Sequence, residues 1–288
     1  MNGNREHSPQ EIADHLRKRI RRGELKPGTR LPTQAKLEEE FGAGRGAVRK
    51  ALTTLRAEGL LSNATKGSPP TVAKRPVAVE TEPQPTLVGL APRLEAAFAV
   101  PDVRLDAVCL TAETLMWSMD APTRLIEMGR VHPRSVEARI LLPSQELKLL
   151  YPAPADGWGQ DEEIDAAVHD RSMTQHTAQL RVLSQHFLRL KNRGEFPVSA
   201  SFRVVENTPY SKVYLLNRTE VLLAHYTIEE REEEIEGKKR LLWDASGTRS
   251  TLFAFNKDYG ARDVQFIDDT QSWFDALWEH VGSDYLTV

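Results

Sequence analysis

The sequence predicts an α+β winged helix-turn-helix head followed by an α/β domain with a mixed sheet. Three observations support this fold class. Residues 8–73 carry short apolar helical patterns separated by glycine-rich breaks, the charge changes sign after residue 75, and strand and helix patterns alternate after residue 100. The chain has 288 residues, of which 40% are hydrophobic, and this is enough for two domains with separate cores.

Charge divides the chain into two parts. Residues 1–75 contain 16 Lys and Arg against 8 Asp and Glu, a net charge of +8, whereas residues 76–288 contain 22 against 33, a net charge of −11. A basic segment joined to an acidic one is typical of a polyanion-binding head with a separate regulatory or assembly domain. Uneven charge by itself favours nucleic acid only weakly.

The head is predicted to contain three helices and a wing. The first helix starts at a capping box, Ser8-Pro9-Gln10-Glu11, with proline at the first helical position. A second helix over 33–41 and a third over about 45–58 are separated by the glycine-rich segment 42–44. Residues 60–72 then supply two short strands. Together these elements make a winged helix-turn-helix, whose second helix enters the DNA major groove.

The third predicted helix carries the side chains that an operator-binding protein needs. Arg45 and Arg49 lie one turn apart with Lys50 beside them, and arginine can hold guanine O6 and N7 in a bidentate pair. An ordinary solvated helix face is the alternative. The acidic run 38–40 is expected to point away from phosphate. The predicted DNA-contacting residues are Thr33, Gln34, Lys36, Gly44, Arg45, Gly46, Arg49, Lys50, Lys66, Gly67 and Ser68.

The head resembles the winged-helix domain of the GntR family of bacterial transcriptional regulators over about residues 8–73. The matching positions are Gly23 to Gly28, Leu31-Pro32, Phe41-Gly42, Arg45, Val48-Arg49, Ala51-Leu52, Leu55 and Glu58 to Leu60. This resemblance implies that Arg45 and Arg49 contact operator bases or phosphates. The chain departs from the usual family pattern at Thr33-Gln34, Ala35, Ala43-Gly44 and Lys50, and these departures argue against a standard family operator.

A linker and a second domain are predicted after the head. Residues 74–92 carry four prolines and are expected to connect the head, residues 1–73, to an effector-binding and dimerisation domain, residues 93–288. We expect a short helix near 93–99; strands at 104–110, 136–142, 198–205, 212–216, 221–225 and 251–255; a hairpin around 236–237; and helices at 112–129, 161–192 and 263–281. The last helix is expected to bury Phe266, Trp273, Phe274, Leu277 and Trp278.

Several classes of protein are disfavoured. The chain has no run of about 18 apolar residues, and its polar N-terminus lacks the apolar segment of a signal peptide. Cys109 is the only cysteine, which excludes an intramolecular disulfide and indicates a reducing compartment. We therefore expect a cytoplasmic protein with no membrane partner. His169 and His176 are about 10 Å apart along a helix, so we expect no metal site, and we also expect no cofactor and no catalytic residue.

Residues 210–225 form a predicted strand–turn–strand that resembles the single-copy phospholipase D-like domain fused to some actinobacterial GntR-type regulators. The resemblance covers roughly 93–282 and rests on the enzyme signature His-x-Lys-x4-Asp. Here Tyr210 stands at the histidine position and Asn217 at the aspartate position, and only Lys212 is retained. Because histidine is the nucleophile in that chemistry, the resemblance implies a non-catalytic domain. Ordinary strand residues at these positions are an equally good interpretation.

A ligand site, if the second domain has one, is expected where strands end, because α/β sheets bind ligands at the carboxyl ends of their strands. The candidate ligand-binding residues are Thr111, Glu113, Ser144, Tyr210, Lys212, Asn217 and His225.

The sequence thus predicts a GntR-type, sequence-specific transcriptional regulator that binds double-stranded DNA as a homodimer, with a small-molecule effector as a further expected partner. Three alternatives remain: a GntR regulator with a chorismate-lyase-like sensing domain, a phosphodiesterase or nuclease targeted by the DNA-binding head, and a plasmid partition or transfer adaptor that binds DNA without controlling transcription.

Overall fold

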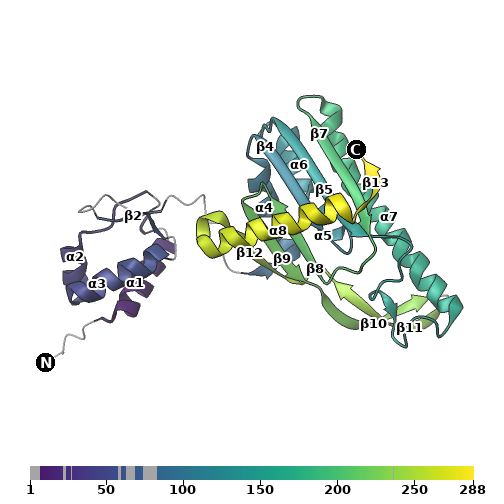
Figure 1. The fold of residues 1–288 in the computed structure, drawn as a ribbon, viewed down its shortest axis with the longest axis horizontal. Coiled ribbons are helices and arrows are strands. Elements are labelled where there is room, and N and C mark those ends of the chain that lie inside the picture. Colours follow the sequence, from purple (N-terminus) through teal and green to yellow (C-terminus); the bar gives the residue numbers. More distant parts are fainter. Residues whose placement is uncertain are drawn as a thin grey trace. The chain divides into compact units, whose positions relative to one another are not determined.

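The chain folds into two compact units, a head that lies N-terminal to residue 79 and a body that holds most of the remaining residues (Figure 1). The computed structural model describes residues 7–21, 24–26, 28–57, 60–62, 69–73, 83–235 and 237–288. The two units are described separately below.

The head has the predicted order of three helices and a two-stranded wing. Its elements are α1 (Pro9–Arg21), α2 (Gln34–Phe41), α3 (Arg45–Ala57), β1 (Leu61–Ser62) and β2 (Thr71–Val72). The two strands pair antiparallel, with Leu61 opposite Val72. The winged helix-turn-helix prediction is therefore confirmed.

Local sequence signals set the ends of these helices. In the predicted capping box, the Ser8 amide donates to Glu11 Oε2 at 2.8 Å and the Glu11 amide donates to Ser8 Oγ at 3.2 Å. Gly42 ends α2 in the left-handed conformation, with φ of 56°, which glycine adopts without steric cost. The head core consists of buried side chains from all three helices and the wing, among them Ile12, Leu16, Leu37, Val48, Ala51, Leu55, Leu61 and Val72.

The body is built on an eight-stranded mixed sheet. The strand order is β13-β7-β5-β4-β8-β9-β12-β3. Strands β4, β5 and β7 are parallel, and the other neighbouring pairs are antiparallel. The strands are β3 (Gln84–Pro85), β4 (Asp102–Val108), β5 (Ser135–Pro143), β7 (Val198–Val205), β8 (Ser211–Leu216), β9 (Glu220–His225), β12 (Thr251–Asn256) and β13 (Ser283–Thr287).

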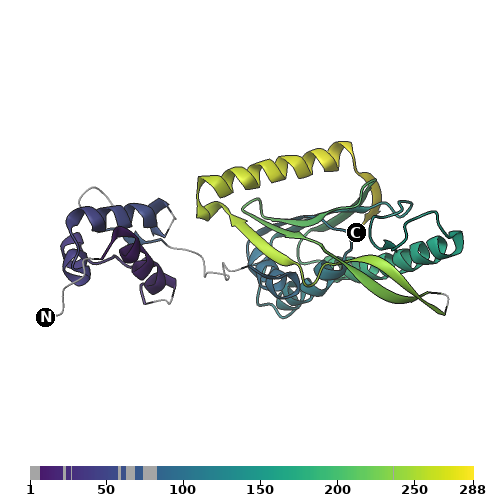
Figure 2. The same ribbon diagram turned by 90° about the horizontal axis from the view of Figure 1, so that it is seen from below.

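Helices cover both faces of this sheet (Figure 2). One face packs against α4 (Thr86–Phe98), α5 (Glu113–Ser118), α6 (Asp120–Glu127) and α7 (Glu162–Arg193) and holds the larger core. The other face packs against α8 (Ala261–His280), which follows the short helix η1 (Lys257–Tyr259). The predicted α/β body with a mixed sheet is therefore confirmed.

A two-stranded arm extends from the body beside α7 (Figure 1). It consists of β10 (Thr227–Ile235) and β11 (Lys238–Ser246), and the short strand β6 (Ala153–Pro154) pairs with β11. A small separate core joins the arm to the first part of α7, through Ile164, Val168, Ile235 and Leu242.

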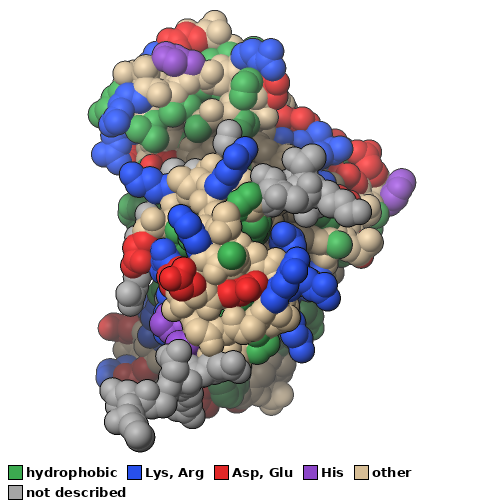
Figure 3. Space-filling view, turned by 90° about the vertical axis from the view of Figure 1, so that its left-hand side faces the viewer, with side chains coloured by type: hydrophobic (Ala, Val, Ile, Leu, Met, Phe, Trp, Pro, Cys, Tyr) green, Lys and Arg blue, Asp and Glu red, His purple; other side chains and the backbone are tan. Residues whose placement is uncertain are grey.

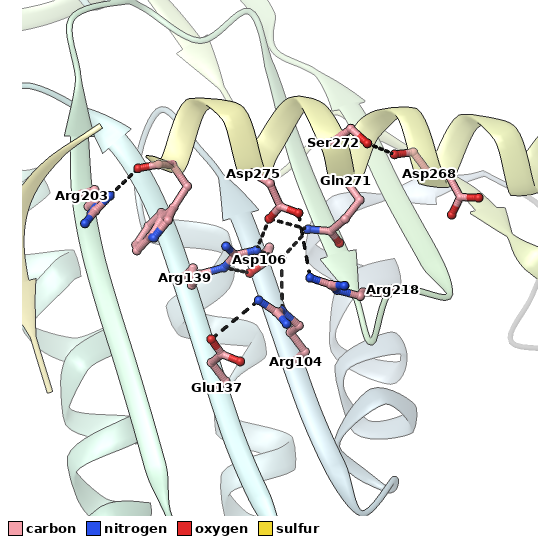
Figure 4. Close-up of polar contacts among 11 residues, drawn as sticks. Arg104, Asp106, Glu137, Arg139, Arg203, Arg218, Asp268, Gln271, Ser272 and Asp275 are labelled. Atoms are coloured by element: carbon pink, nitrogen blue, oxygen red, sulfur yellow. Dashed lines mark hydrogen bonds and ion pairs between the residues drawn. The ribbon is translucent and has the colours of Figure 1, made fainter. Parts of the chain in front are cut away.

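A buried ionic network fixes α8 to the sheet (Figure 4). Asp106 on β4 accepts two hydrogen bonds from Arg139 on β5, at 2.7 and 2.6 Å, and one from Gln271 on α8 at 2.9 Å. Arg139 also donates to Asp275 on α8 at 2.6 Å. Burial alone would lower the pKa of Arg139, but the hydrogen bonds to the two carboxylates raise it overall. The guanidinium is therefore held in its charged form.

Two helices differ from their predicted bounds. The helix expected near 93–99 starts at Thr86 as α4, so the last third of the predicted linker is helical. Leu90, Leu94 and Ala97 bury one stripe of that helix, and this packing outweighs the helix-breaking tendency of Pro92. The single helix expected over 112–129 is instead α5 and α6, divided at Met119. Pro122 has no N–H with which to bond the Ser118 carbonyl, which accounts for the division.

The predicted burial of Trp273 is wrong. Its side chain is 44% exposed, whereas Phe274 is fully buried. The buried stripe of α8 follows Ile267, Phe274 and Trp278, and a neighbouring residue on a helix points about 100° away from such a stripe. The final strand, β13, was not predicted.

Candidate DNA-binding surface and body cavity

The exposed side of α3 carries three cations. Arg45, Arg49 and Lys50 are all exposed, and none of them forms an ion pair with another residue that the structure describes. Figure 3 shows basic side chains distributed over the surface of the head nearest the viewer, with acidic ones between them. The first turn of α3 contains no acidic side chain that would oppose the positive end of the helix dipole.

The turn between α2 and α3 is braced by two of the predicted DNA-contacting residues. The Gln34 side chain donates from Nε2 to the Arg45 carbonyl oxygen at 3.1 Å. Thr33 caps α2 by accepting a hydrogen bond from the Lys36 amide at 3.4 Å. These contacts set the position of α3 relative to α2. Contact of Thr33, Gln34 and Lys36 with DNA stays a prediction.

The glycines beside Arg45 leave the start of α3 unobstructed. A Cβ atom on Gly44 or Gly46 would meet no atom within 4 Å, so another chain can approach the backbone there. On α2, Glu40 pairs with Arg19 of α1 at 2.7 Å, which engages one acid of the run 38–40 inside the head. The predicted wing contacts Lys66, Gly67 and Ser68 lie outside the described residues.

The body contains a cavity of about 740 Å³ beside the middle of α7. Its wall includes Thr111 and Glu113 from the segment after β4, as predicted for a site at strand ends. The other lining residues come from α7, the arm and the loop after β11; they are Leu110, Pro152, Ser172, Gln175, His176, Ala178, Gln179, Tyr226, Glu229, Arg231, Asp244, Ala245, Ser246, Gly247, Thr248 and Arg249. We call this space the α7 cavity.

Lys212 lies behind the wall of the α7 cavity and is only 2% exposed. Its Nζ donates to Thr114 Oγ1 at 2.9 Å and to the Gly247 carbonyl at 2.6 Å, and it lies 5.1 Å from the centre of the Tyr226 ring. A Cβ atom on residue 247 would lie 2.6 Å from that Nζ, so the approach requires glycine. Burial lowers the pKa of Lys212 to about 8.

The remaining candidate ligand residues are not part of the cavity wall. The Tyr210 side chain is 68% exposed, and His225 is exposed and hydrogen-bonded to Ser211 at 2.7 Å. Ser144 is buried, and its hydroxyl accepts from the Glu146 amide at 3.3 Å.

Asn217 lies at the opposite end of β8 from Lys212, about 17 Å along the strand. Its side chain accepts a hydrogen bond from the Arg104 amide at 2.8 Å and donates one to the Ala97 carbonyl at 2.9 Å. The structure therefore separates Asn217 from Thr111 and Glu113.

Sequence reasoning missed the residues that α7 and the arm contribute to the α7 cavity. Ser172, Gln175, His176 and Gln179 follow one face of α7 at spacings of three and four. This spacing marks a shared face, but polar residues on a long helix are usually solvated. Only the packing of the arm beside α7 encloses them.

In the described part of the chain, no three His, Cys, Asp or Glu side chains lie together in a way that could hold a metal ion. Among the described residues, no helix is both long and apolar enough to span a membrane.

Known proteins match the head alone. Residues 9–68 match the family "Bacterial regulatory proteins, gntR family". The mannosyl-D-glycerate transport/metabolism system repressor MngR of Escherichia coli (strain K12) is 48% identical over 59 residues, 20% of this chain and 25% of that protein. The HTH-type transcriptional repressor NagR of Bacillus subtilis (strain 168) is 43% identical over 51 residues, 18% of this chain and 21% of that protein. The chain thus spans about a quarter of the length of these curated relatives.

A likeness to a solved structure extends over more of the chain but is weak. Phosphatidylserine synthase of Haemophilus influenzae Rd KW20 aligns with a TM-score of 0.35 and 13% identity, over 86% of this chain and 47% of that chain. A TM-score of this size establishes no common fold. The family match and the geometry of the head agree with each other, and residues 9–68 of this chain form a GntR-family helix-turn-helix DNA-binding domain.

Proposed function

We propose that this protein is a sequence-specific transcriptional regulator that binds double-stranded DNA through α3. The observation that carries this proposal is the group of three exposed cations, Arg45, Arg49 and Lys50, without an ion-pair partner among the described residues, on the second helix of a GntR-family domain. The printed names of MngR and NagR, two repressors that match this domain, support the same function.

In the proposed complex, α3 lies in the major groove with its first turns toward the bases. Arg45 and Arg49 each hold a guanine or a phosphate, and Lys50 adds a phosphate contact. The exposed backbone at Gly44 and Gly46 lets the positive end of α3 approach a phosphate. Thr33, Gln34, Lys36 and the wing residues 66–68 flank this contact.

For the body we propose a phospholipase D-like domain without catalysis. Tyr210 occupies the position of the nucleophilic histidine, and its exposed phenol has no histidine partner to activate it. Lys212, the retained signature residue, is buried and already bonded to Thr114 and Gly247. Phosphodiester cleavage by the purified protein that disappears in Lys212→Ala would contradict this part of the proposal and favour the DNA-targeted phosphodiesterase.

We further propose that the protein acts as a homodimer in the cytoplasm. Two heads would bind half-sites about one helical turn apart, as two-fold symmetric helix-turn-helix dimers do. The body would dimerise and respond to a small-molecule effector. Light scattering coupled to size-exclusion chromatography tests the dimer: the proposal expects twice the chain mass of 32.4 kDa, and a monomer in the presence of operator DNA contradicts it.

The decisive experiment is fluorescence anisotropy on DNA fragments from the region upstream of the gene, over a series of salt concentrations. The double variant Arg45→Ala/Arg49→Ala should lose about 30-fold or more in affinity, and the slope of log K against log salt should fall by about 2. The matched control is Arg124→Ala/Arg134→Ala, which removes two exposed arginines from the body. Equal binding by wild type and the α3 variant on every fragment would reject α3 as the recognition helix.

A further inference from the structure

The charged groups around the α7 cavity are already matched with one another. Arg249 pairs with Glu229 at 2.5 Å, and Arg231 pairs with Asp244 at 3.2 Å. The third acid of the wall, Glu113, acts on the ammonium of Lys212 behind the wall and favours its charged form. A charged ligand would therefore have to break one of these pairs or enter without a counter-ion, and both cost free energy.

The groups left to bind a ligand are neutral and form hydrogen bonds. Ser172 is 4% exposed, and its hydroxyl has no hydrogen-bond partner among the described residues; the same is true of the amide oxygen of Gln179. Burial lowers the pKa of His176 to about 4, so this imidazole is neutral at pH 7. A buried polar group without a partner costs about 1–3 kcal/mol, which a bound hydroxyl group would recover.

The remaining wall gives the cavity an apolar side. Tyr226 lines it and is 9% exposed, while its hydroxyl is engaged by the Leu110 amide at 2.6 Å. The ring is thus fixed and can only offer carbon surface to a ligand. A volume of about 740 Å³ falls within the range of small-molecule sites, about 300–1,000 Å³.

We propose that the α7 cavity binds an uncharged, hydroxyl-rich small molecule of the size of a mono- or disaccharide. The ligand hydroxyls bond Ser172, Gln179 and the other neutral groups on α7, and its carbon face lies against Tyr226. The site identifies the class of the effector that we assigned to the body. Binding is measured without DNA, so its failure leaves the DNA-binding proposal intact, and the reverse also holds.

The test is calorimetric titration of the full-length protein with neutral sugars (glucose, galactose, mannose, maltose and trehalose). Glucosamine and gluconate serve as charged analogues of glucose. At least one neutral sugar should bind with Kd between about 1 µM and 1 mM, and any charged analogue should bind at least about tenfold more weakly than its neutral counterpart. The proposal is overturned if no neutral sugar saturates the protein by about 10 mM, or if the charged analogues bind as tightly.

A matched pair of substitutions on α7 locates the site. Gln179→Leu removes a wall amide, whereas Gln185→Leu makes the same change at an exposed position outside the wall. The first should weaken sugar binding about tenfold and the second should leave it unchanged. Equal effects of the two would overturn the assignment to this cavity. If Gln179→Leu fails to fold, Ser172→Ala, which deletes one hydroxyl, replaces it with the same two readings.

Discussion

The head and the body use charge in opposite ways. The recognition helix of the head holds Arg45, Arg49 and Lys50 on an exposed face without ion-pair partners among the described residues. In the body, Arg139 is buried between Asp106 and Asp275 on facing elements. An exposed charge without a partner costs the fold almost nothing and is available to a ligand, whereas a buried pair is part of the fold itself. The comparison separates charges kept for binding from charges kept for structure.

The largest effect should come from breaking the buried network. Asp106→Ala leaves Arg139 and Gln271 without a main partner, and loss of one member of a buried ion pair costs about 3–5 kcal/mol. The five tryptophans report the unfolding of the body alone, because all lie in it: Trp117, Trp158, Trp243, Trp273 and Trp278. Urea unfolding followed by their fluorescence measures the change. The matched control is Asp120→Ala, which breaks an exposed pair with Arg124 and should cost less than about 1 kcal/mol.

Acid should destabilise the body through His176. Burial lowers the pKa of this imidazole to about 4, whereas an unfolded histidine titrates near 6.5. As pH falls from about 6.5 toward 4, the unfolded state takes up a proton that the folded state refuses, so the free energy of unfolding falls. Between pH 7 and 4.5, wild type should lose about 2 kcal/mol more than His176→Gln in the same fluorescence assay. Parallel pH curves for the two proteins would contradict the assignment, and His225→Gln, at an exposed position, should follow wild type.

The head should respond to its caps. Ser8→Ala removes the side chain that accepts from the Glu11 amide, and loss of such a cap costs about 1 kcal/mol. Hydrogen exchange in α1 of the full-length protein should accelerate about fivefold, while the urea midpoint from tryptophan fluorescence stays unchanged. A shift of that midpoint would show that the two units unfold together.

The smallest effect on stability should come from the residues assigned the largest effect on binding. Arg45→Ala/Arg49→Ala removes exposed charges that form no ion pair with any described residue, so hydrogen exchange in α1 and α3 should change by less than about 0.5 kcal/mol. A loss of stability above about 1 kcal/mol would mean that these arginines support the fold. The contrast drawn between head and body would then fail at its central point.

Much of the fold was predictable because local signals are strong. The capping box at Ser8, the glycine break at 42–44 and the Asp161 cap of α7 each determine a helix end from a few neighbouring residues. Strand β7 has the predicted bounds, residues 198–205, because a continuous apolar run is distinctive between a helix and a turn. The DNA-contacting residues stay predictions, although α3 places three of them on one exposed face.

The errors arise where distant contacts outweigh local preference. The proline-rich composition of 83–92 favoured a linker, but burial of Leu90 and Leu94 against the body core makes the segment helical. The α7 cavity exists only because the arm folds back beside α7, a contact between segments about 60 residues apart in sequence that no local pattern indicates. Of the seven candidate ligand residues, only Thr111 and Glu113 reach its wall.

Helix α7 is a single rod that belongs to two cores. Its 32 residues span about 48 Å. Ile164 and Val168 near its start pack with the arm, whereas Leu183 and Phe187 near its end pack against the main sheet. The stretch from 172 to 179 lies between these anchors and forms one wall of the α7 cavity. The arm therefore cannot swing away from the main sheet unless the rod bends or leaves one of its anchors, and the cavity sits at the point of greatest leverage.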